Sequence, residues 1–80
     1  MNEEKLRLLF SVRDSGLGVA KQGKTLRNTC AGVYGFKDNY FVYSKDEWVE
    51  RLDKVLDEMN TLRIQLDQME ELVYDLRKLI

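Results

Sequence analysis

The second half of the chain carries an unbroken heptad pattern of hydrophobic residues. From residue 48 to residue 80, apolar side chains recur at alternating spacings of four and three, which is typical of a helix that packs along another helix. Residues 45–80 contain no glycine or proline, so we expect one continuous helix of about 54 Å. The pattern predicts an oligomer interface of ten residues: Trp48, Leu52, Val55, Met59, Leu62, Leu66, Met69, Val73, Leu76 and Ile80.

Local signals mark the start of this helix. Ser44 is followed three residues later by Glu47, which is the spacing of a capping box. Tyr43 and Trp48 occupy the two positions of a hydrophobic staple. The helix is therefore predicted to begin at residue 45.

The length of the helix argues for assembly. A compact chain of this size is about 30 Å across. The rest of the chain is therefore too small to cover a helix of about 54 Å. Exposing the distal apolar residues costs about 1.5–3 kcal/mol per side chain. We expect a homo-oligomer, either a dimer or a tetramer, with the orientation of the helices left open. A break near Asn60-Thr61 that folds the helix onto itself is the alternative.

Apolar residues also flank the heptad positions. They widen the stripe beyond a two-helix seam, so either the first half of the chain packs along the helix or more than two helices associate. These flanking residues are Val49, Leu56, Leu72 and Leu79.

The first 44 residues predict smaller elements. A helix is expected from Glu3 to Asp14, ended by Ser15-Gly16 and followed by a glycine-containing loop over 16–24. Two β-like runs, 29–36 and 40–43, are separated by a three-residue turn and predict a β-hairpin. The predicted fold is α+β, mainly α. It is a single domain, 1–80, with a head over 1–44 and an oligomerisation helix over 45–80.

The charge is unevenly distributed, although the net charge is only −1. Residues 1–44 hold seven basic and four acidic side chains, whereas residues 45–80 hold six basic and ten acidic ones. The chain has no histidine and one cysteine, Cys30, so we expect no disulfide, metal site or cofactor, and no enzymatic activity. With no signal peptide or membrane span expected, the cytoplasm is the predicted location.

The segment Gly18 to Thr25 fits the spacing of a phosphate-binding loop, G-x-x-x-x-G-K-T. Such loops follow an apolar strand and precede a helix, and neither is predicted here. A linker is the simpler interpretation. Phosphate or nucleotide capture by this loop stays open as an alternative.

The head is where we expect contact with a partner. A basic loop lies close in sequence to an aromatic hairpin whose rings could stack on bases or pack on a protein. We expect a small non-catalytic interaction protein, acting as an adaptor, inhibitor, sequestering module or regulator; the alternative is an oligomeric nucleic-acid-binding regulator. The candidate binding residues are Lys21, Lys24, Thr25, Arg27, Tyr34, Phe36, Lys37 and Tyr40.

Overall fold

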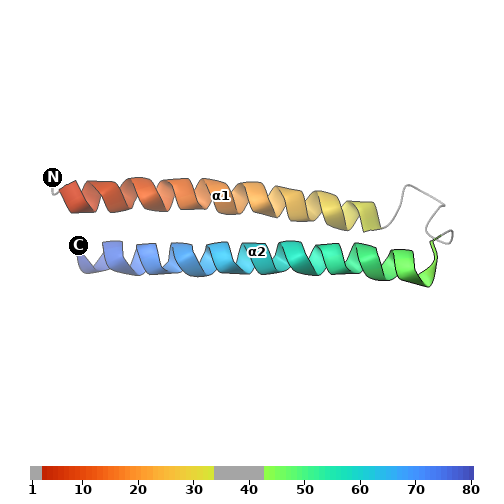
Figure 1. Cartoon of the computed structure of the whole chain (residues 1–80). Helices are drawn as coiled ribbons and strands as arrows, with labels where there is room; N and C mark the ends of the chain where they lie inside the picture. The colour runs from red at the N-terminus through yellow and green to blue at the C-terminus, as the bar shows by residue number, and fades with distance from the viewer. Residues whose placement is uncertain (1–2, 34–42) are drawn as a thin grey trace.

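Two long antiparallel helices lie side by side in the computed structural model of the chain (Figure 1). Helix α1 spans Glu3–Val33 and helix α2 spans Lys45–Lys78, and the structure describes residues 3–33 and 43–80. The molecule measures 59 × 18 × 13 Å, with a radius of gyration of 18.1 Å, whereas a compact chain of this length has a radius near 12 Å. The fold is a helical hairpin.

The predicted α+β fold is wrong. The segment 16–24, expected to be a loop, and residues 29–33, expected to begin a strand, both belong to α1. Neither of the two described segments contains a strand. The rest of the predicted β-hairpin, up to residue 42, lies outside the described residues. A break near Asn60-Thr61 is also wrong, because α2 is continuous there.

Packing against α2 explains why α1 continues through its glycines. Half-buried positions recur along α1 at alternating spacings of four and three, so one side of the helix follows α2 along its length. This contact outweighs the helix-breaking tendency of the Ser15-Gly16 pair, which is about 1 kcal/mol for a glycine in a helix. The residues that face α2 are Leu8, Val12, Ser15, Val19, Gln22, Leu26 and Thr29.

The start of α2 confirms the predicted cap. The Ser44 hydroxyl accepts a hydrogen bond from the backbone N–H of Glu47 at 3.2 Å. The rings of Tyr43 and Trp48 meet edge to face, with centroids 5.2 Å apart, as expected for the hydrophobic staple. At the other end α2 ends at Lys78, and the backbone N–H of Leu79 donates a hydrogen bond to the carbonyl oxygen of Leu76 in the preceding turn.

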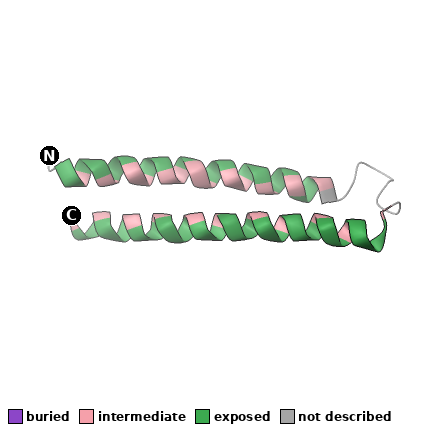
Figure 2. Ribbon diagram, in the orientation of Figure 1, coloured by how far each residue is buried: buried purple, intermediate pink, exposed green. Residues whose placement is uncertain are grey.

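The contact between the two helices buries their facing side chains only in part. Half-buried residues face one another along both helices, while the outer sides are exposed (Figure 2). None of the described residues is fully buried. The chain exposes 6686 Å², compared with about 5,000 Å² for a folded monomer of its mass. A large part of the surface is therefore open to further contact.

Gly18 tests whether α1 is helical through the segment expected to be a loop. A Cβ atom added there meets nothing within 4 Å, so Gly18→Ala should raise the free energy of unfolding by about 1 kcal/mol in a helix interior. Thermal or urea unfolding followed by circular dichroism measures this. Lys24→Gly, at an exposed position of the same helix, should lower stability by a similar amount. A destabilising Gly18→Ala would contradict the helix.

Candidate interaction surface

Helix α2 uses one side to contact α1. The residues of this inner face are half-buried and alternate at spacings of three and four. Five of the ten residues predicted to form an oligomer interface therefore face α1 within the same chain. The inner face consists of Trp48, Arg51, Val55, Glu58, Leu62, Gln65, Met69, Leu72, Leu76 and Leu79.

A second apolar line runs along α2 beside the inner face and is exposed. It follows the same alternating spacing, and each of its members comes directly after an inner-face residue in the sequence. Because successive residues of a helix are rotated by about 100°, the two lines look in nearly perpendicular directions. We call this second line the outer stripe. Its apolar members are Val49, Leu52, Leu56, Met59, Leu66, Val73 and Ile80, and its charged members are Arg63, Glu70 and Arg77.

The predicted ten-residue seam is thus divided between two faces. The positions of Val55 and Leu62 face α1, whereas those of Leu52, Met59 and Leu66 remain exposed. The flanking apolar residues fall on both faces. Helix α1 packs along α2, as in the first of the two expectations, that the first half of the chain covers the widened stripe. A second contact on the outer stripe stays a prediction.

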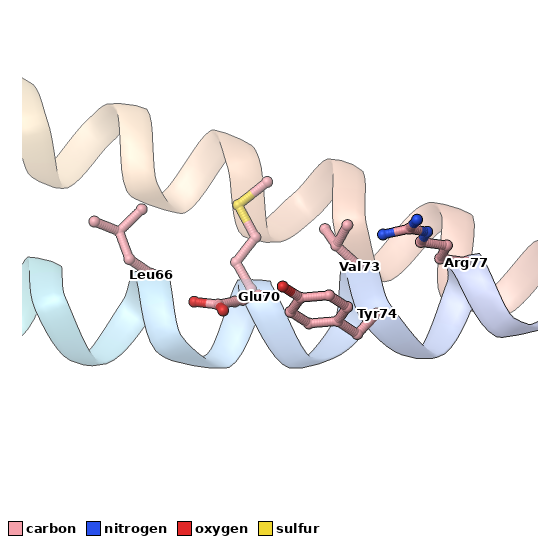
Figure 3. A pocket seen from close by; sticks show the side chains of 6 residues that line it. Leu66, Glu70, Val73, Tyr74 and Arg77 are labelled. Atoms are coloured by element: carbon pink, nitrogen blue, oxygen red, sulfur yellow. The ribbon is translucent and has the colours of Figure 1, made fainter.

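An open groove of about 620 Å³ lies on the C-terminal half of α2. Leu66, Met69 and Val73 supply apolar walls, and Tyr74 borders them. In Figure 3 the Tyr74 ring lies between Glu70 and Arg77 on successive turns of the helix. The groove therefore combines an apolar lining with one acid and one base, a lining suited to a helix that carries apolar and charged side chains.

The inner face carries polar groups that do not pair. Glu58 Oε2 and Gln65 Oε1 are shielded from solvent and have no hydrogen-bond partner. A shielded polar atom without a partner costs about 1–3 kcal/mol. These two residues lower the stability of the isolated hairpin, which strengthens the case for an additional stabilising contact.

Arg51 joins the two helices at the end where the chain reverses. Its guanidinium donates a hydrogen bond to the carbonyl oxygen of Gly32 at 3.1 Å and stacks over the Tyr43 ring at 4.0 Å from the centroid. Gly32 lies in the last turn of α1, where carbonyl groups are left without helical partners and carry partial negative charge. The Arg51 cation therefore caps α1 while belonging to α2.

Arg51→Ala is expected to lower the free energy of unfolding by about 1–2 kcal/mol, because it removes a charge-assisted hydrogen bond and a cation–π contact. Chemical denaturation at a fixed protein concentration measures the change. Lys54→Ala, which removes an exposed cation from the next turn, is the matched control and should stay within about 0.5 kcal/mol of the wild type. Equal losses in the two variants would rule out the Arg51 contact as a stabilising feature.

Only half of the candidate binding residues of the head lie in the described part of the chain. Lys21, Lys24, Thr25 and Arg27 are exposed on α1. Predicted residues Tyr34, Phe36, Lys37 and Tyr40 lie outside the described part of the chain.

The phosphate-loop interpretation of the segment from Gly18 to Thr25 is not supported, because this segment is in the interior of α1. Backbone N–H groups in a helix interior are bonded to carbonyl groups one turn earlier, so they cannot form a nest around a phosphate. The Thr25 hydroxyl also donates to the carbonyl oxygen of Lys21 at 3.2 Å.

Neither helix of the described chain is both long and apolar enough to cross a membrane. Comparisons with protein-family models, with curated proteins and with solved structures return no match.

Proposed function

We propose that this protein is a non-catalytic interaction protein that assembles through the outer stripe of α2. The observation that carries the proposal is the exposure of seven large apolar side chains along one line of one helix. Single exposed apolar residues are common, but apolar residues that recur along one face of a helix indicate a contact surface. Covering it stabilises the protein by about 25 cal/mol for each Å² of apolar surface removed from water.

The shape of the hairpin suits a protein that acts by occupying a surface. Two helices, 59 Å in the long direction, present a straight line of apolar side chains with charged residues set between them. This is the arrangement by which helices recognise grooves on other helical proteins. We propose that the protein acts as an adaptor, inhibitor or sequestering module in this way.

Affinity capture with three tagged forms of the protein tests the proposal. The wild type and Ile64→Asp should recover the same binding protein, whether untagged copies of this chain or another protein, and Leu66→Asp should lose it. Ile64 is exposed to the same degree as Leu66, at 50% and 46% respectively, but lies outside the outer stripe. Recovery of the same proteins by all three baits, or of none by any, would contradict the proposal.

Nucleic-acid binding is a second candidate, favoured by one observation. Lys21, Lys24 and Arg27 are exposed within two turns of α1, and cations so placed can contact phosphates of one backbone. Retardation of a duplex at low salt, lost in Lys21→Glu/Lys24→Glu and falling steeply with added salt, would support this candidate. No retardation at low salt would remove it.

A further inference from the structure

We infer that the occupant of the outer stripe is α2 of a second copy, running antiparallel to the first, so that two hairpins form a four-helix bundle. This inference rests on the proposed function and specifies its partner. Three independent features of the chain support it: the angle between the two faces of α2, the charges within the outer stripe, and the small residues on the adjoining face of α1.

The angle between the faces of α2 matches a bundle. Each inner-face residue is followed directly by an outer-stripe residue, as in the pairs Leu62 with Arg63 and Gln65 with Leu66. The faces are therefore about 100° apart around the helix. In a four-helix bundle each helix has two neighbours at nearly a right angle. Helix α1 is one of these two neighbours of α2. The outer stripe faces the position that the second neighbour, α2 of the other copy, would occupy.

The charges within the outer stripe select the antiparallel orientation. In a parallel pair in register, Arg63, Glu70 and Arg77 would each face their own copies, which are like charges in the middle of an apolar contact. When the two stripes run in opposite directions and overlap over residues 49–80, Arg63 of each copy lies within one helical turn, about 6 Å along the axis, of Glu70 of the other. Two reciprocal ion pairs replace the repulsion.

The same overlap fills the groove on α2. It places Leu56 of the second copy beside Val73, and Met59 of the second copy beside Glu70, in the groove bordered by Leu66 and Tyr74. The two-fold axis passes between residues 64 and 65, so each copy fills the groove of the other. The resulting interface is isologous, as expected for a two-fold dimer.

The adjoining face of α1 carries small residues where the second α1 would lie. In the same bundle each α1 contacts the other α1. The contact uses the residues of α1 that directly follow, in the sequence, the residues that face α2. At the centre of that face are Gly16, Ala20 and Gly23, with Arg13 and Arg27 at its two ends, and Gly16 also borders Met69 of α2 in the same chain. The antiparallel overlap set by α2 places Gly16 of one copy opposite Gly23 of the other, with Ala20 near the axis. Small residues at these positions allow the two helices to approach closely.

The exposed area is large enough for this dimer. The chain exposes 6686 Å², which exceeds the area of an average folded monomer of its mass, about 5,000 Å², by about 1,700 Å². A stable interface of standard size removes about 800 Å² from each partner. The hairpin therefore has more excess surface than one such contact requires.

Distances between spin labels on the two copies test the orientation directly. Cysteines for labelling would be placed at Glu50, Ile64 or Lys78, which share a side of α2 away from both contacts, in a Cys30→Ser background because Cys30 is free and exposed. The antiparallel pair predicts the shortest distance at Ile64, with axial offsets of about 40 Å at the other two sites. Equal distances at all three sites would establish a parallel pair and overturn the inference.

A charge exchange provides a second test. Arg63→Glu and Glu70→Arg should each weaken dimerisation about tenfold or more, and the double variant should restore it, because the reciprocal pairs are rebuilt with opposite polarity. In a parallel dimer Arg63→Glu exchanges one like-charge pair for another, so neither loss nor rescue is expected.

The two levels of the proposal fail separately. A wild-type protein that stays monomeric at all accessible concentrations, or that binds a different protein in place of its own copy, overturns the second-copy inference. The proposed function fails if the wild type, Ile64→Asp and Leu66→Asp all recover the same proteins, or if none of them recovers any.

Discussion

Leu66→Asp is expected to convert the assembled protein into single chains. Leu66 lies in the middle of the outer stripe, next to the proposed two-fold axis and opposite Arg63 of the other copy. Each dimer would therefore receive two carboxylates near its centre, which would compete with Glu70 for Arg63 and break the reciprocal ion pairs. The change removes apolar contact in both copies and forces charged groups out of water. We expect the dissociation constant to rise at least a hundredfold, corresponding to about 3 kcal/mol, as measured by sedimentation equilibrium.

The helical content should fall in the same variant. The hairpin has no fully buried residue among those described and carries two shielded polar atoms without partners, so we expect its fold to depend on the proposed assembly. Circular dichroism of Leu66→Asp should show lower helicity at the same concentration, and Ile64→Asp should match the wild type in both measurements. Equal dimerisation by the two aspartate variants would show that the outer stripe is not the interface.

Leu62→Ala is expected to lower the free energy of unfolding by about 2–3 kcal/mol. Leu62 is in the middle of the inner face, where it packs against α1, and truncating a leucine in such a contact removes apolar burial and leaves a cavity. Urea unfolding at a fixed protein concentration measures the loss. The full penalty of a buried leucine is not expected, because Leu62 is only half-buried.

Ile64→Ala is the matched control for this change. Ile64 is two residues away on the same helix and 50% exposed, and it belongs to neither face, so its truncation should alter stability by about 0.5 kcal/mol or less. Similar losses for Leu62→Ala and Ile64→Ala would contradict the assignment of the inner face.

The sequence was informative about α2 because its signals are local. The cap at Ser44, the staple between Tyr43 and Trp48, and the absence of glycine and proline each act within a few residues. The prediction that the helix starts at residue 45 is confirmed. The same heptad pattern did not reveal that half of its residues face α1 and half remain exposed, because positions spaced by four and three look alike whether one helix or two pack against them.

Helix α1 was missed because its signals come from packing with α2. Val12, Val19 and Leu26 repeat at intervals of seven, and Leu8 lies four residues before Val12. Ser15, Gln22 and Thr29 interrupt the apolar line between and after these residues. Glycines over the same segment favour a loop when local preference alone is considered. Reading the repeat of four apolar residues across the glycines would have found the helix.

The candidate site was predicted only in part. The five apolar heptad residues that lie in the outer stripe were predicted to form an interface, and they are exposed and remain candidates for one. Val49 and Leu56 were recognised as residues that flank the heptad positions. That they belong to the outer stripe, together with its charged residues, becomes clear only once the position of α1 is known. Lys21, Lys24 and Arg27 proved to be part of α1, so within the described residues they do not form the predicted loop.

The molar mass of the unmodified protein decides whether the outer stripe joins two copies. Sedimentation equilibrium over a range of micromolar concentrations should give twice the chain mass of 9.4 kDa, with dissociation toward single chains on dilution. A mass of 9.4 kDa at every concentration, with the helical content unchanged, would show that the hairpin is stable alone and would contradict the proposed dimer.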